Sequence, residues 1–242
     1  MATQQILVPA KGKKHSVLIE KYFYFSMSLL ISAVVVYGFS HTVNQNLIHA
    51  APPRPWILWV HGIVFSGWVA FFILQSALVR TRNVKIHRTL GWFGAGLAAL
   101  MTVLGTSTAV VMDRFNFLHF HSSRTFFAIQ LLDMVSFTTC FWLAVYWRKK
   151  PEFHRRLILI ATCVLLSAAF ARFPQVPHIA WAYFGVDGMI LLGVLRDLLV
   201  NRKVHAVDRY ALPALIVSQT FMVHLWLLPP AWWVRMTDAI IG

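Results

Sequence analysis

Seven apolar stretches follow one another along the chain, separated by short polar segments. They lie at about residues 22–40, 56–79, 89–112, 125–147, 157–173, 178–200 and 211–229. A helix needs roughly 17–25 mostly apolar residues to cross a bilayer, and each stretch reaches that length. The pattern therefore predicts an all-α, polytopic membrane protein built as a bundle of seven transmembrane helices.

Composition supports this interpretation and leaves no room for a separate soluble domain. The 242 residues are 58% hydrophobic and only 12% charged, and the mean hydropathy is +0.64. A soluble domain is nearer a quarter charged. We expect a basic N-terminal segment at 1–21, one membrane domain at 22–230, and a C-terminal segment at 231–242. The last carries adjacent tryptophans and is expected to lie flat at the membrane interface.

The positive charge is concentrated in alternate connecting segments. Seventeen of the 22 Lys and Arg residues lie before the first stretch or after the second, fourth and sixth. Cytoplasmic loops carry this excess, so we expect the N-terminus inside and the C-terminus outside, with the first stretch serving as a signal anchor. The net charge of +14 is thus assigned to orientation in the bilayer. It is divided among four loops, which argues against a nucleic-acid partner.

Five side chains are candidates for function because they bring charge or metal-binding capacity into the apolar stretches. They are His61, His224, Asp133, Asp187 and Arg172. Intramembrane ionisable groups are costly and usually mark functional sites. From their positions along the stretches, all five are expected in the outer half of the bundle. We predict a polar cavity there that binds a ligand or a proton. A purely structural hydrogen-bonded network is the alternative.

A weak internal repeat relates two segments that each begin an apolar stretch. Both read basic-x-x-x-x-His-Arg-x-Leu, and the matching residues are Arg82, His87, Arg88 and Leu90, then Lys149, His154, Arg155 and Leu157. The repeating unit would be a two-helix hairpin formed by stretches 2–3, 4–5 and 6–7. Parallel repeats of this kind suggest packing about an axis along the membrane normal.

The histidines also raise the hypothesis of a b-type haem or quinone-linked redox protein. His61 and His224 are expected at similar depth on different helices, as two axial or metal ligands would be. A two-haem protein would need a second pair, and His87 and His154 occupy equivalent positions of the repeat. An interfacial histidine next to an arginine is also ordinary in a basic loop. Haem b therefore stays one alternative for an otherwise unknown cofactor.

Several activities are excluded by missing signatures. The last stretch has no lysine between Ala211 and Pro229 to form a retinal Schiff base. No phosphate-binding glycine loop is present, which argues against an ATP-driven pump. The His-Glu-x-x-His and Gly-x-Ser-x-Gly patterns of membrane proteases are absent as well. Whether the protein is an enzyme is left open.

One longer pattern carries a resemblance. It joins a His-Gly…Trp…Gln segment to His-Arg-x-Leu-Gly, and its residues are His61, Gly62, Phe65, Trp68, Phe72, Gln75, His87, Arg88, Leu90 and Gly91. This pattern resembles a family of uncharacterised bacterial multi-pass inner-membrane proteins of unknown function. The resemblance implies a bacterial inner membrane and no activity. Besides the lipid bilayer, we expect as partners either further copies of the chain or a larger membrane complex.

Overall fold

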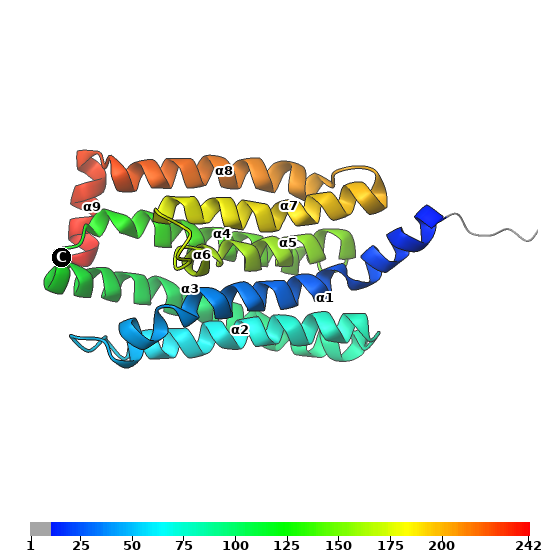
Figure 1. The fold of residues 1–242 in the computed structure, drawn as a ribbon, viewed down its shortest axis with the longest axis horizontal. Coiled ribbons are helices and arrows are strands. Elements are labelled where there is room, and N and C mark those ends of the chain that lie inside the picture. The colour runs from blue at the N-terminus through cyan, green and yellow to red at the C-terminus, as the bar shows by residue number, and fades with distance from the viewer. Residues whose placement is uncertain (1–10) are drawn as a thin grey trace, which may run out of the picture.

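The computed structural model describes residues 11–242 and contains, within that range, helices and no strand (Figure 1). Residues 1–10 of the expected basic segment lie outside the described part. The elements are α1 (Lys11–Ser40), η1 (Asn44–Ile48), α2 (Ile57–Arg80), α3 (Val84–Phe120), η2 (Arg124–Phe126), α4 (Phe127–Tyr146), α5 (Pro151–Val164), α6 (Ser167–Phe170), η3 (Ile179–Trp181), α7 (Ala182–Asn201), α8 (Ala206–Leu227) and α9 (Ala231–Ile241).

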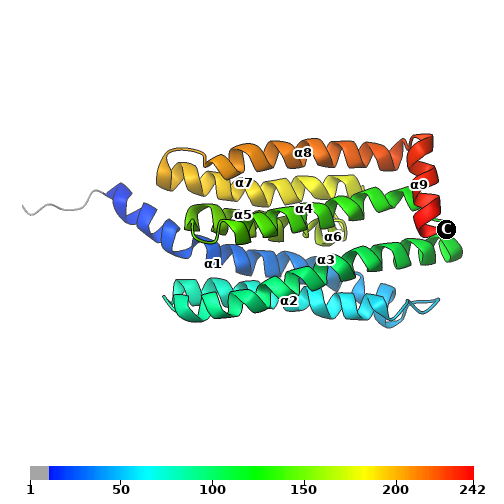
Figure 2. The same ribbon diagram turned by 180° about the vertical axis from the view of Figure 1, so that it is seen from behind.

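The long helices run side by side along one direction, and α9 lies across one end of the bundle (Figures 1 and 2). We call that end the α9 end. The opposite end, where α1 begins, also holds the α2–α3, α4–α5 and α7–α8 connections. These connections carry three of the four basic clusters, so we call it the basic end. The alternation of charge in the sequence thus becomes a separation between the two ends.

Six of the helices are long and apolar enough to cross a membrane, as in a multi-pass membrane protein. They are α1, α2, α3, α4, the α5–α6 segment and α8. The expected stretch 178–200 corresponds to α7, which has 20 residues but includes Asp187, Arg196 and Asp197. It lies beside the other helices (Figure 2) without meeting the same criterion.

Several helices extend beyond the apolar stretches. The expected 89–112 stretch lies within α3, whose 37 residues make a rod about 55 Å long at about 1.5 Å per residue. Charged and polar residues do not end a helix outside the hydrocarbon layer, so α3 continues beyond the expected stretch at both ends. The expected 157–173 stretch is interrupted instead, because the Leu166 amide bonds the Cys163 carbonyl, three residues back, and tightens the turn between α5 and α6.

Apolar side chains cover the outside of the bundle as well as filling it. Inside, Trp68 packs edge-on against Phe137 and Phe141, with ring centroids 5.4 and 5.7 Å away. Outside, large apolar side chains such as Ile63 and Phe184 are more than two-thirds exposed. A helix that is apolar all round needs an apolar solvent, which is the property of a membrane-spanning helix.

The C-terminal helix α9 is attached to the end of the bundle by one buried edge. Trp233 and Ile241 are buried in a small cluster with Phe127 and Leu225. The remaining face of α9 is largely exposed. This arrangement gives α9 one apolar edge against the bundle and one side free, as an interfacial helix requires.

Candidate functional site

Asp133 is the centre of a polar contact between three helices near the α9 end. It lies within two turns of the start of α4 and accepts a hydrogen bond of 2.5 Å from the Ser167 hydroxyl of α6. The Tyr183 hydroxyl of α7 donates to its other oxygen at 3.3 Å. Both donors are uncharged, so the carboxyl group is solvated by hydroxyls and not neutralised by a cation.

Asp187 extends this polar group to a fourth helix. It lies one turn beyond Tyr183 on α7 and accepts a hydrogen bond of 3.0 Å from the Gln219 amide of α8. Gln219 is buried, and Asp187 is partly buried. The two predicted aspartates therefore lie on neighbouring helices with Tyr183 between them. We call Asp133, Ser167, Tyr183, Asp187 and Gln219 the carboxyl cluster.

His61 and Arg172 form a second, separate part of the α9 end. The His61 ring stacks on Phe65 with centroids 3.9 Å apart, and its buried Nδ1 has no hydrogen-bond partner. Arg172 follows α6 and is the charged group that acts electrostatically on His61. Its guanidinium donates to the Ala168 carbonyl and lies 4.4 Å from the Phe39 ring. Among the described side chains, no ion pair joins Arg172 to either aspartate.

His224 does not join any of these groups. It is exposed on the surface of α8. Helix α8 forms one edge of the bundle and α2, which carries His61, forms the opposite edge (Figures 1 and 2). The expected pairing of His61 and His224 around one haem or metal ion is therefore not formed. Both residues were expected at similar depth from their positions along the apolar stretches, but depth along a helix does not determine which way a side chain faces.

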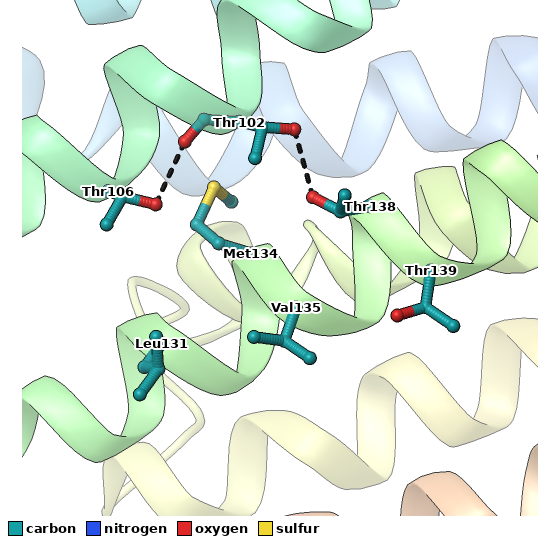
Figure 3. Close-up of a pocket in the computed structure, with 7 residues that line it drawn as sticks. All are labelled: Thr102, Thr106, Leu131, Met134, Val135, Thr138 and Thr139. Atoms are coloured by element: carbon teal, nitrogen blue, oxygen red, sulfur yellow. Dashed lines mark hydrogen bonds between the residues drawn. The ribbon is translucent and has the colours of Figure 1, made fainter.

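Two grooves are found in the described part of the molecule, and none of the five candidate side chains lines either of them. One groove of about 190 Å³ lies between α3 and α4 (Figure 3). Its threonines bond each other and the helix backbone, with Thr102 and Thr138 hydroxyls 2.9 Å apart. A second groove of about 310 Å³ lies between α1 and α7 and is almost wholly apolar. The carboxyl cluster lies outside both grooves.

The densest polar cluster is one that the sequence did not single out. At the basic end, Arg156 of α5 makes two bonds to Asp197 of α7, Nε–Oδ2 at 2.8 Å and Nη2–Oδ1 at 2.6 Å. Its Nη1 reaches Glu152 at 2.7 Å, and Asp208 of α8 lies 3.6 Å from Nε. Arg156 and Asp197 are almost completely buried, with side chains 3% and 1% exposed. The bidentate pair joins α5 to α7, and Asp208 adds α8.

Arg196 widens this arginine cluster towards α1. It donates to Asp197 at 2.8 Å and lies 3.6 Å from Glu20. His205 lies beside the cluster. Its Nδ1 accepts a hydrogen bond from the Val207 amide and thereby caps α8. Burial lowers the pKa of the His205 imidazole, and the nearby Arg156 adds to the effect. The cluster therefore holds α1, α5, α7 and α8 together.

A signal for this cluster was present in the sequence. The chain has only eight acidic residues, and four of them lie close to the basic segments. Those four are Glu20, Glu152, Asp197 and Asp208. An acid that is retained within a strongly basic segment is a good candidate for an ion pair. The arginines of these segments predicted only the orientation of the chain in the bilayer.

Asp113 is a further buried acid that sequence reasoning missed. Its side chain accepts a 3.2 Å bond from Gln130 of α4, while Oδ2 is buried without a partner. The expected stretch stopped at residue 112 because Asp113 and Arg114 follow it. In the structure α3 continues to Phe120 and carries Asp113 against α4. The predicted apolar stretch therefore ended one residue before this acid.

Comparison with known proteins adds no identity. The chain matches no protein-family model, no curated protein and no solved structure. The functional interpretation therefore depends on the geometry described above.

Proposed function

We propose that the protein is a seven-span integral protein of a bacterial inner membrane that binds a proton reversibly at the carboxyl cluster. The basic end would face the cytoplasm and the α9 end the outside, and α7 would be the seventh span. In this role the cluster serves proton-coupled movement of a small solute. The observation that carries the proposal is the placement of Asp133 and Asp187 within the spans, bonded only to neutral groups.

The chemistry of the cluster supports this function. An ionised carboxylate is very costly in a low-dielectric interior unless a cation or a proton neutralises it. Among the described side chains, none of the cationic groups forms an ion pair with Asp133 or Asp187. A proton is the smallest species that can neutralise such a group, and it needs no preformed cavity.

The distribution of charge supports the orientation. Segments rich in Lys and Arg resist translocation, so they are retained on the cytoplasmic side. The α2–α3, α4–α5 and α7–α8 connections meet at one end (Figure 1), and this common end supports an α7 that crosses like its neighbours. Three charged residues lower its mean hydropathy, but Arg196 and Asp197 lie in its last two turns and are paired.

An infrared pH titration of the purified protein in lipid tests the proposal directly. A carboxyl group that takes up a proton in an apolar site gives a C=O stretching band that an exposed acid does not give. We expect such a band in the wild type, and its loss in Asp133→Asn or its reduction in Asp187→Asn. Asp238→Asn serves as the control, because this acid lies at the exposed surface of α9.

Proton movement is measured in the same preparation reconstituted into liposomes that enclose a pH-sensitive dye. Valinomycin and potassium clamp the voltage, and an acid pulse is applied outside. We expect the wild type to acidify the lumen faster than empty liposomes, and both cluster variants to be at least about tenfold slower. A titration without a pH-dependent carboxyl band, or equal bands in the wild type and both variants, would refute the function.

A further inference from the structure

The second histidine pair, at the basic end, is brought together by the fold. His87 and His154 are each the fourth residue of their helices, since α3 begins at Val84 and α5 at Pro151. Their imidazole centroids are 6.3 Å apart and the ring planes are 78° apart. Two residues related by the weak repeat thus face each other across helices that are not neighbours in the chain.

The separation of the rings matches one coordination geometry. A metal–nitrogen bond is about 2.0–2.1 Å long and a ring nitrogen lies about 1.1 Å from the ring centre, so two imidazoles on opposite sides of one metal have centroids about 6.3 Å apart. The same bonds at a tetrahedral angle would bring the centroids to about 5.1 Å. The observed centroid distance of 6.3 Å equals the value for two ligands in trans, as on copper or an axially ligated iron, and exceeds the value for a tetrahedral zinc site.

The contact behind the His154 ring is that of a ligating histidine. Nδ1 of His154 lies 2.9 Å from the Ala144 carbonyl near the end of α4. A proton on Nδ1 would make this hydrogen bond and leave Nε2 with a free lone pair.

Unsatisfied polar atoms next to the pair indicate a missing partner. Nδ1 of His87 is buried without a hydrogen bond that meets normal geometry. The side chain of Gln75 is nine-tenths buried, and both its amide atoms lack a partner. Buried polar groups are almost always paired in native proteins, so each exception needs an explanation. A metal or cofactor bound at the pair is one such explanation, because it would also position the side chains around it.

The chemistry around the pair limits what it binds. Among the described residues, no third His, Cys, Asp or Glu joins these two into a larger ligand set. Arg88 and Arg155 directly follow the two histidines, and further basic residues lie in the adjoining loops. A bare hard cation is disfavoured by such a field. Haem, with its two anionic propionates, is favoured, and a copper ion bound by neutral imidazoles is the other source of the same trans geometry.

We propose that His87 and His154 are trans ligands of one transition-metal centre, haem iron or a copper ion, bound between α3 and α5 at the basic end. The site is independent of the carboxyl cluster, which lies in the other half of the bundle. It also differs from the His61 and His224 pair that depth alone suggested.

The test is to express the full chain with added 5-aminolaevulinate and iron, or with added copper, and to purify it in detergent. An absorbance spectrum with a pyridine haemochromogen assay measures haem, and elemental analysis with electron paramagnetic resonance measures copper. We expect about one equivalent of one of the two groups in the wild type. His87→Ala should lower that occupancy at least about tenfold, because one of only two protein ligands is lost.

His224→Ala is the matched control, since this histidine is exposed on α8 and should leave the occupancy unchanged. If His87→Ala does not accumulate, His87→Met keeps a donor atom and should retain the group with an altered absorption spectrum. A wild type that holds neither haem nor copper overturns the proposal. So does full occupancy in His87→Ala, or a loss of occupancy in His61→Ala alone.

Discussion

Asp197→Asn should destabilise the protein more than any other single neutralisation of an acid at the basic end. The carboxylate receives two bonds from Arg156 and one from Arg196, at 2.6 to 2.8 Å. Asparagine keeps the shape but presents an NH₂ group to one guanidinium, and it leaves two buried positive charges without their main counterion. Removing one partner of a buried pair costs about 3–5 kcal/mol.

The surviving contacts place the expected cost at the lower end of that range. Glu152 still reaches Arg156 at 2.7 Å, so that guanidinium keeps one carboxylate. We therefore expect a loss of about 3 kcal/mol, which for a chain of this size corresponds to a fall in Tm of about 6–12 °C. The measurement is thermal unfolding in detergent, followed by the fluorescence of the ten tryptophans.

Glu152→Gln is the control for this prediction. It removes the same charge from the same cluster, but the Glu152 side chain is 52% exposed, so the expected cost is below about 1 kcal/mol. Arg156→Met combined with Asp197→Asn should cost less than the sum of the single variants, because both remove one interaction. Equal melting temperatures for Asp197→Asn and the wild type, or for Asp197→Asn and Glu152→Gln, would refute the assignment of the cluster as an interhelical lock.

Four further variants test packing at other places in the bundle by the same melting assay. Gly38→Ala should cost about 1–3 kcal/mol, because a Cβ there would meet the backbone carbonyl of Ala169, whereas Gly96→Ala, whose Cβ has open space, should cost nothing. Asp238→Ala removes a half-exposed ion pair that holds α9, so the loss should be below about 1 kcal/mol; a larger loss would mean that this pair, and not Trp233, attaches the helix. His224→Ala should leave the Tm within about 1 °C, since its side chain is exposed, and a larger change would place it inside the bundle.

The sequence predicted the helical class well because transfer into a bilayer depends on residue type summed over a window. The α2 and α4 helices lie within two residues of the expected 56–79 and 125–147. The same sum fails where a helix leaves the hydrocarbon, as α3 does beyond residue 112. At α7 the sum is lower than for the other long helices, although Arg196 and Asp197 are paired inside the bundle and so do not cost what unpaired charges would.

The candidate site was predictable only in part, because the depth of a residue along its helix does not determine the direction in which its side chain points. Asp133 and Asp187 do contact other helices, and their partners Ser167 and Gln219 carry no charge that would mark them in a sequence. The position of His224 along its stretch gave no information on its direction. The His87 and His154 pair was visible as a repeat, and only the fold could bring the rings to 6.3 Å.

The acids inside the bundle have opposite surroundings in its two halves, and this contrast separates stability from chemistry. Asp238, which is paired with Arg124, lies on α9 across the end of the bundle. At the basic end each acid lies within 4 Å of an arginine, so its charge holds helices together. Such a pair has little freedom to exchange partners, since releasing the acid would strand a buried cation. In the α9 half, Asp133 has two neutral donors and no counterion. Under the proposed function a proton binds and leaves there without breaking an ion pair, while the ion pairs of the basic end hold the helices together.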